Sequence, residues 1–260
     1  MVLYTDGMAG AHPGSQIDTH IQSLIDQAND ALCNSNINTW FNLVYSEEVN
    51  YPDDSPNDMN EALYDLTDNS GVFANVEDLR TEYGADQVTL LRRFVDEGCG
   101  LAWLLRYDNA GLAYAVVHDG AKTDGSGWYC SDLTYAHEIG HNLGCAHDRD
   151  NAGSRGKYSY SYGYQEPDKK FRTVMSYNCP GGCNQIDYFS NPEVTYMGDP
   201  TGIADPSPNS ADNARTINQT RMGMAGYRDE AQPILAVISP DGDEVWRRDT
   251  SHIIAWSSSN

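Results

Sequence analysis

Three histidines, two carboxylates and two glycines gather in the segment HEIGHNLGCAHD, which covers residues 137–148. On an α-helix, residues four positions apart lie on the same face, so His137 and His141 can reach one metal ion together. Imidazole nitrogen binds zinc at about 2.0–2.1 Å, and catalytic zinc sites typically have three protein ligands and one open position. The segment therefore predicts a catalytic site for one Zn2+ ion, provided that a third ligand is available.

His147 can be that third ligand only if the helix ends before it. A continuous helix would carry His147 about 9 Å beyond His141, because each helical residue adds about 1.5 Å. Gly144 lies between the two histidines, and glycine readily accepts the positive φ at which many helices end. We therefore expect the chain to reverse at Gly144 and to bring the three imidazoles together.

Glu138 follows the first histidine and lies about 100° further round the helix, beside the metal rather than on it. Zinc lowers the pKa of a bound water towards neutrality, and a carboxylate in this place can take the proton and pass it to a leaving amine. The whole pattern, H-E-x-x-H-x-x-G-x-x-H, would arise by chance on the order of 10⁻⁵ times in a chain of this length. The chemistry predicted is peptide-bond hydrolysis with Glu138 as the general base.

The helix that carries these residues is expected over residues 131–143, with Ser131 or Asp132 as its N-cap. Before it, short apolar runs alternate with amphipathic stretches, which is typical of a mostly parallel sheet with crossover helices. The expected strands are residues 2–5, 39–51 and 86–95, and the expected helices are residues 15–32, 58–64 and 76–83.

Two further strands are expected at residues 100–105 (GLAWLL) and 112–118 (LAYAVVH). The six residues between them cannot hold a crossover helix, so the two strands should pair antiparallel. Residues 144–208 are rich in Gly, Pro, Asn, Asp and Tyr and predict a largely irregular segment. A last amphipathic helix should follow, capped by Ser210.

The composition limits the partners of the chain. Sixteen Lys and Arg residues stand against 38 Asp and Glu residues, for a net charge of −22. A field of this sign repels nucleic acid and anionic membrane surfaces. No apolar run approaches the roughly 18 residues needed to cross a bilayer. We expect a monomer that acts on proteins or peptides.

Six cysteines occur without paired C-x-x-C motifs, which favours disulfides in an exported protein over a cysteine-rich zinc site. We expect Cys99 to pair with Cys130. Cys145 is expected to pair with Cys179 or Cys183. The alternative is that the last two close the small loop CPGGC between themselves.

The extended histidine motif, together with Met175 in the downstream segment FRTVMSYN, resembles the metzincin zinc peptidases. Asp148 after the third histidine resembles the reprolysin, or adamalysin-like, branch. The segment from YFSNPEVTYMGDPTG to MAGYR is similar to secreted bacterial members of that branch, including the peptidyl-Asp metallopeptidases. The resemblance covers about residues 2–228.

The resemblance implies an α/β (α+β) fold: a twisted, mostly parallel five-stranded sheet with an antiparallel edge strand, an active-site helix and a largely irregular lower subdomain. It also implies secretion, from a bacterium. Met175 would form a hydrophobic floor under the zinc, and Tyr177, placed as in astacins and serralysins, could stabilise the tetrahedral intermediate. An extended substrate would pair with the edge strand, at Gly100, Leu101, Ala102, Trp103 and Leu104.

If the peptidyl-Asp resemblance is close, the pocket for the residue after the cut should contain a basic group. The candidates by sequence proximity are Arg155, Lys169, Lys170 and Arg172. The acidic stretch NYPDDSPNDMN, residues 50–60, could also bind Ca2+, although it has no EF-hand pattern.

The domain organisation expected is a catalytic domain over residues 1–228, followed by residues 229–260. This second part has Pro breaks and strand patterning, and it resembles a linker with the opening strands of an Ig-like module. Roughly 28 residues cannot form a sandwich of about 100, so the module would be truncated. Such modules often mediate attachment, which suggests the alternative function of an inactive zinc-containing binding or adhesion module.

Overall fold

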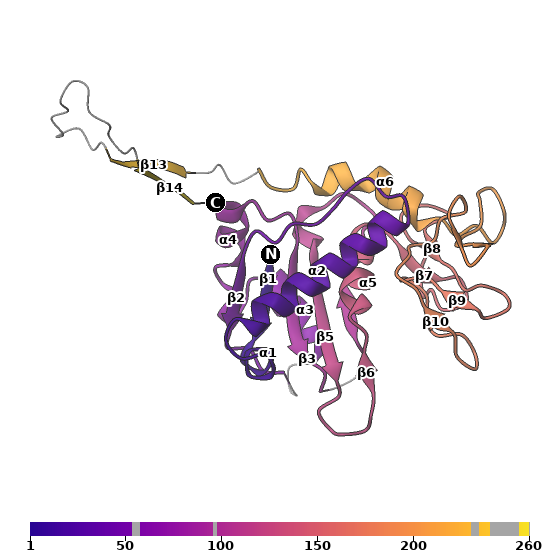
Figure 1. The fold of residues 1–260 in the computed structure, drawn as a ribbon, viewed down its shortest axis with the longest axis horizontal. Helices are drawn as coiled ribbons and strands as arrows, with labels where there is room; N and C mark the ends of the chain where they lie inside the picture. The colour runs from indigo at the N-terminus through magenta and orange to yellow at the C-terminus, as the bar shows by residue number, and fades with distance from the viewer. Residues whose placement is uncertain (54–57, 96–97, 230–233, 240–254, 260) are drawn as a thin grey trace.

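The computed structural model is built around one twisted sheet with the strand order β2-β1-β3-β5-β4 (Figure 1). The structure describes residues 1–53, 58–95, 98–229, 234–239 and 255–259. The strands of this sheet are β1 (Val2–Thr5), β2 (Ser46–Val49), β3 (Val88–Arg93), β4 (Gly100–Ala102) and β5 (Tyr114–Ala121), and β6 (Tyr129–Cys130) pairs with the end of β5.

The pairing of these strands confirms the expected architecture. β2, β1, β3 and β5 are parallel to their neighbours, whereas β4 runs antiparallel to β5. The connection between β4 and β5 contains only a short 3-10 helix, η2 (Ala110–Leu112). The mostly parallel sheet with an antiparallel edge strand is therefore present.

Two strands are shorter than the apolar runs predict. The run at residues 39–51 contributes only four residues, because its partner β1 is itself four residues long. The run at residues 100–105 leaves the sheet after Ala102, and the amide of Leu105 donates to the carbonyl of His141 at 3.0 Å. The end of the edge strand is thus bonded to the helix that carries the histidines.

Helices cover both faces of the sheet (Figure 1). They are α1 (Asp6–Ala11), α2 (Gln16–Asn34), α3 (Met59–Thr67), α4 (Val76–Tyr83), α5 (Leu133–Asn142) and α6 (Asn213–Met224), with the 3-10 turn η1 (Gly71–Phe73). The expected helices at residues 15–32, 58–64, 76–83 and 131–143 are confirmed, apart from one to three residues at their ends.

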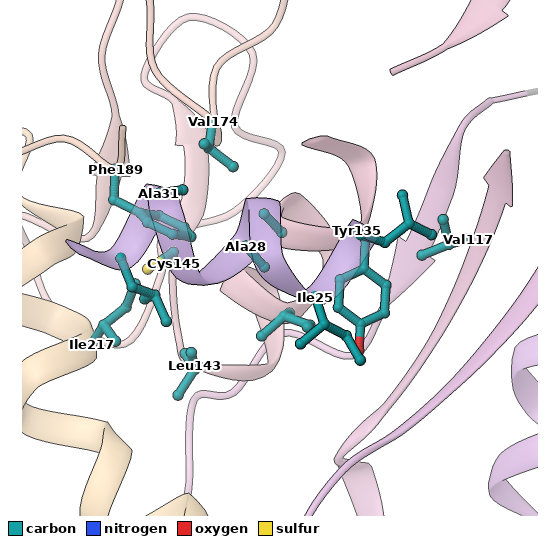
Figure 2. Packing of buried hydrophobic residues seen from close by; sticks show 14 of the residues in the cluster. Ile25, Ala28, Ala31, Val117, Tyr135, Leu143, Cys145, Val174, Phe189 and Ile217 are labelled. Carbon is teal, nitrogen blue, oxygen red and sulfur yellow. The ribbon is translucent and has the colours of Figure 1, made fainter. Parts of the chain in front are cut away.

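Alternation along the strands separates two hydrophobic cores. Leu91 and Val117 face a cluster with α2 and α5, whereas their neighbours Leu90 and Val116 face a cluster with α3 and η1. Figure 2 shows the first cluster, in which residues of α2 pack beside Tyr135 of α5. The helix that bears the metal motif is therefore held by a buried face rather than by its own propensity.

The N-caps of two helices can now be compared with the prediction. At α5 the hydroxyl of Ser131 accepts from the amide of Leu133 at 3.2 Å, while the Asp132 side chain makes no cap bond. At α6 the prediction of Ser210 was wrong: the carboxylate of Asp212 accepts from Arg215 N at 2.9 Å. Ser210 instead precedes Ala211, which pairs with Ile203 and is extended.

The segment after α5 contains only short paired stretches, as its composition predicts. They are β7 (Ala146–Asp148) with β8 (Tyr162–Gly163), β9 (Phe171–Arg172) with β10 (Asn184–Gln185), and β11 (Thr195–Tyr196) with β12 (Asp199–Pro200). This irregular lower subdomain lies beside α5 and α6 (Figure 1).

Two disulfides connect the described residues. Cys99 pairs with Cys130, as expected, and joins the start of β4 to the segment before α5. The expected bond of Cys145 to this region was wrong: Cys179 and Cys183 pair with each other, and the Cys145 thiol is free and buried in the core. Three residues lie between the bonded cysteines, so the small loop closes on itself.

Near the C-terminus, β13 (Ile234–Ser239) and β14 (Ala255–Ser259) pair antiparallel. The expected Ig-like nature of residues 229–260 stays a prediction, since most of these residues lie outside those described. Among the described helices, none is both long and apolar enough to cross a membrane.

Candidate metal centre

The three histidines of the motif converge on one point. The Nε2 atom of His147 lies 3.0 Å from that of His141 and 3.1 Å from that of His137. All three ligand atoms lie within 4.8 Å of one another. The arrangement suits a single ion bound by three nitrogens.

Backbone carbonyls hold two of these rings in orientation. His137 Nδ1 lies 2.8 Å from the carbonyl oxygen of Val174, and His141 Nδ1 lies 2.8 Å from that of Cys145. A carbonyl can only accept, so each ring donates through Nδ1 and keeps its Nε2 lone pair for a metal. The Cys145 carbonyl belongs to the turn that directly follows α5, whereas the Val174 carbonyl comes from a segment that only the tertiary fold brings to the helix.

Gly144 makes the reversal that the sequence predicts. Its φ is +95°, a conformation that glycine adopts without strain, and its amide donates to the carbonyl of His141 at 2.9 Å. A Cβ atom there would lie 2.9 Å from the Cβ of Lys157 and 3.2 Å from the carbonyl oxygen of Leu105. Backbone conformation and packing both require glycine at this point.

The surroundings keep the imidazoles neutral. Burial, followed by the neighbouring histidines, lowers the pKa of His137 well below its ordinary value. Burial and His147 lower the pKa of His141 to about 3, and burial lowers that of His147. Neutral imidazole is the form that binds a metal, so the triad needs no deprotonation near pH 7.

The Glu138 carboxylate lies beside this triad and is 4% exposed. Its Oε2 atom has no hydrogen-bond partner among the described residues, and burial raises the pKa of the carboxyl to about 8. A buried carboxyl without a partner costs free energy unless a cation or a bound water compensates it. Three neutral imidazoles with such a carboxyl therefore fit a catalytic metal.

Gly100 provides the space that this carboxylate occupies. A Cβ atom at Gly100 would overlap the Cγ, Cδ and Oε1 atoms of Glu138. The first residue of β4 thus lies against the Glu138 carboxylate. This close approach of β4 to the carboxylate explains why residue 100 is a glycine. The sequence alone predicts only that Gly100 belongs to the strand expected to bind substrate.

Met175 and Asp148 fix the floor of the site. Met175 is fully buried, and its sulfur lies where a side chain on Gly140 of α5 would be. Asp148 accepts from the amide of Tyr177 at 2.9 Å and from the Asn151 side chain at 2.8 Å. The residue after the third histidine therefore ties that loop to the methionine turn.

Tyr177 lies at the edge of the centre. Its ring centroid is 4.3 Å from that of His147, its side chain lines the cleft, and the residue is 48% exposed. It is thus not a packed core tyrosine. Burial and the charges of Glu138 and Asp148 raise the pKa of its hydroxyl, so the phenol stays protonated and can donate.

A cleft of about 970 Å³ runs past the triad. Of the residues expected in the substrate-binding strand, Gly100, Leu101, Ala102 and Leu104 line it. Trp103 does not: its indole Nε1 donates to Thr67 Oγ1 at 2.8 Å, on the α3 side of the sheet. Trp103 follows the last residue of β4, and its indole packs against the hydrophobic cluster on the α3 side of the sheet.

Of the four basic candidates, only Arg172 lines the cleft. Its guanidinium donates to the carbonyl of Ser176 and, at 3.2 Å, to Gln185 Oε1, while its Nε has no partner among the described residues. Lys169 and Lys170 instead bond Pro180 and Asp199 away from the cleft, and Arg155 is exposed.

Asn142 is a positioning residue that sequence reasoning missed. Its buried carboxamide donates to the carbonyls of Trp103, at 2.8 Å, and Tyr114, at 3.1 Å, and accepts from Gln87 at 2.7 Å. These bonds join the end of α5 to the sheet beside β4. An asparagine in a helix next to a metal ligand has no local signature that predicts such long-range bonds.

Comparison with known proteins agrees with this geometry. The model of metallopeptidase family M12, of its Reprolysin_5 group, matches residues 1–190. The chain belongs to metallopeptidase family M12. Membership implies a catalytic metal, and the histidine triad is the set of residues that fits one.

Curated relatives come from bacteria and are named peptidyl-Asp metalloendopeptidase. The protein of Stenotrophomonas maltophilia is 31% identical over 88% of this chain and 52% of its own length. Those of Xanthomonas campestris and Pseudomonas aeruginosa are each 30% identical, over 88% and 90% of this chain and 51% and 40% of their own. The M12 chain thus spans about half the length of the relatives it matches, or less.

A chain in a solved structure described as a chaperone–substrate complex has the same fold. It aligns with a TM-score of 0.67 and 22% identity, over 88% of this chain and 34% of that one. At this identity the likeness concerns the fold alone, which agrees with the mixed α/β architecture of the family.

The buried carboxyl makes a prediction about stability. In the metal-free protein the Glu138 carboxyl keeps its proton up to about pH 8, whereas in the unfolded chain it ionises near pH 4.5. The folded state binds the extra proton across this interval, so wild type loses stability as pH rises through it. Glu138→Gln removes that loss of stability. Each kcal/mol of stability that the variant retains should raise its unfolding temperature by roughly 2–4 °C.

The measurement is thermal unfolding of both metal-free proteins across this interval. Their midpoints should agree near pH 4.5, and the variant should unfold at the higher temperature near pH 8. If the difference in unfolding temperature between the two proteins does not change with pH, Glu138 is not a buried, protonated carboxyl.

Proposed function

We propose that this chain is the catalytic part of a secreted bacterial zinc endopeptidase that acts as a monomer on protein or peptide substrates. The observation that carries the proposal is the unpartnered Glu138 carboxylate beside three converging, neutral imidazoles. Membership of family M12 and the names of its relatives support it.

Zinc is the ion that fits the donor set. Three imidazole nitrogens from His137, His141 and His147 suit Zn2+, which takes four-coordinate sites with one open position. When bound, the ion would supply Lewis-acid polarisation of the scissile carbonyl and lower the pKa of a water in the open position. Calcium at residues 50–60 stays a prediction, because residues 54–57 lie outside those described.

Glu138 performs the proton transfers in this proposal. Its carboxylate accepts a proton from the attacking water, a role that the nearby dication favours by lowering the raised pKa of the carboxyl. It then donates that proton to the leaving amine. The Tyr177 hydroxyl, protonated and on the cleft side, donates to the oxyanion that develops on the carbonyl oxygen.

The edge strand binds the substrate backbone. β4 is the last strand of the sheet, so its outer edge can pair with an extended peptide through main-chain bonds. Gly100 and Leu101 line the cleft beside Glu138, so a peptide paired with β4 would lie next to this carboxylate.

The alternative function is a binding or adhesion module that has kept zinc and lost activity, suggested by the pattern of residues 229–260. Such a module has no use for a buried, unpartnered carboxylate beside the ion. The Glu138 variant distinguishes the two functions.

Glu138→Gln should lower the rate of casein cleavage by at least about 10²-fold, because general acid–base catalysis typically contributes 10²–10⁴. The metal content should stay that of wild type, since Glu138 is not a ligand. Chelation should abolish wild-type cleavage, and added zinc should restore it. If neither wild type nor variant cleaves any of many proteins, the result supports the alternative function of a binding module. If both cleave casein equally fast, Glu138 is not the general base.

Gly100→Ala should also inactivate the enzyme while leaving the metal bound. The new methyl group would occupy the place of the Glu138 carboxylate and displace it. Gly153→Ala is the matched control, because Gly153 also lines the cleft and a Cβ there would contact nothing. We expect kcat to fall by about 10²-fold or more in the first variant only. Equal activity of both variants would show that the carboxylate does not need this position.

A finer proposal concerns the residue after the cut. We infer that Arg172 recognises an acidic side chain there, as the name of the relatives suggests. Its guanidinium lines the cleft, and no carboxylate of the described residues forms an ion pair with it. A partly buried guanidinium on the cleft wall that forms no ion pair within the protein can bind a carboxylate of the substrate.

Peptides that differ only in this residue test the role of Arg172. In Arg172→Gln, kcat/KM for an Asp peptide should fall by about 10–100-fold, as expected for a lost charged hydrogen bond, while an Asn peptide should be cleaved as before. Lys170→Gln, which loses ion pairs to Asp199 and Asp168 away from the cleft, should change neither rate. If wild type cleaves the Asp and Asn peptides equally well, Arg172 does not recognise an acidic side chain at this position.

A further inference from the structure

A second cluster of metal-binding side chains lies outside the cleft. His12 is the residue that follows α1, His20 lies on α2, and Asp119 lies near the end of β5. The ligand atoms of the three side chains lie within 4.8 Å of one another. None of the three lines the cleft of the catalytic triad, so the cluster is separate from the site above.

The two imidazoles face the same carboxylate oxygen. His20 Nε2 lies 2.9 Å from Asp119 Oδ2, and His12 Nε2 lies 4.0 Å from it. The rings are stacked, with centroids 4.1 Å apart and an angle of 8° between their planes. Stacking alone does not require both Nε2 atoms to lie on the side of Asp119 Oδ2, whereas chelation of one ion requires the three donor atoms to converge, as they do here.

These separations suit a small cation. Ligand atoms of a tetrahedral zinc site with bonds of about 2.1 Å lie about 3.4 Å apart. The distances of 2.9 and 4.0 Å bracket that value, so shifts of about half an ångström would seat the ion. In the catalytic triad of the same structure the nitrogens are likewise 3.0 and 3.1 Å apart.

The surroundings leave a position open to solvent. The Asp119 side chain is 7% exposed, whereas those of His12 and His20 are 28% and 19% exposed. A water molecule can therefore complete the coordination of an ion on the outer side. Burial, followed by the neighbouring His20, lowers the pKa of His12, so that this imidazole is neutral near pH 7.

We propose that His12, His20 and Asp119 form a second, structural site for a divalent transition-metal ion, foremost Zn2+. Two imidazoles and one carboxylate are donors that Zn2+ prefers, whereas Ca2+ and Mg2+ prefer oxygen alone. The ion would fasten α1 and α2 to the end of β5. Because it binds only the folded chain, it would stabilise the fold by mass action.

Sequence reasoning missed this site because its ligands have no motif. His12, just after α1, and His20, on α2, are eight residues apart, and Asp119 follows about a hundred residues later. Only the docking of α2 on the sheet brings them together. The inference does not depend on the proposed peptidase activity.

The test is the number of zinc ions bound by the full chain after equilibrium dialysis against free Zn2+, measured by elemental analysis. We expect two ions per wild-type chain, and one ion fewer in His20→Ala and in His141→Ala. The double variant should bind none. Gln22→Ala, an exposed change on the same helix, is the matched control and should bind as many ions as wild type.

Asp119→Asn tests the site without deleting a ring. The amide oxygen can still accept from His20, so the fold keeps its hydrogen bond, but a neutral ligand should weaken zinc binding at this site by more than about tenfold. Circular dichroism verifies that each variant is folded, and zinc should raise the unfolding temperature of His141→Ala but not of the double variant.

One ion per wild-type chain, with no loss in His20→Ala or Asp119→Asn, would overturn the proposal. If His20→Ala fails to fold, Asp119→Asn decides. Folded Asp119→Asn should cleave casein at the wild-type rate. The zinc count therefore tests the second site, and casein cleavage separately tests the proposed peptidase function.

Discussion

The convergence of three neutral imidazoles is the constraint on which the rest of the structure depends. Their Nε2 atoms meet because α5 ends at a glycine with φ +95° and because two carbonyls, of Val174 and Cys145, hold two of the rings. Gly144 and Cys145 follow α5 directly in the chain, whereas Val174 belongs to a segment that α5 must meet in the fold. The buried faces of α2 and α5 supply the packing that keeps the helix in that place.

The edge strand and the acid–base group form one unit. β4 begins with a glycine that makes room for the Glu138 carboxylate, and it ends where Leu105 bonds to the carbonyl of His141. Asn142 adds bonds from the helix to the carbonyls of the sheet. Any shift of β4 would therefore move the carboxylate relative to the metal ligands, which couples substrate binding to the chemistry.

The same chain uses histidine in two different ways. In α5 the histidines are four residues apart on one helix and end in a cleft, where an open position is useful. At the far end of β5, His12 and His20 come from separate segments and share one aspartate, where an ion would connect helices to the sheet. The first arrangement is suited to catalysis and the second to stability.

The sequence by itself determined the features that depend on local geometry. Helical spacing placed His137, Glu138 and His141 on α5, glycine's freedom in φ located the turn at Gly144, and the short connection made β4 antiparallel. The tertiary structure alone decided that the Val174 carbonyl orients His137, that Arg172 rather than the neighbouring lysines lines the cleft, and that Cys145 stays unpaired. These outcomes depend on contacts between residues far apart in the chain, whose proximity is set by the docking of helices on the sheet and leaves no periodic signal.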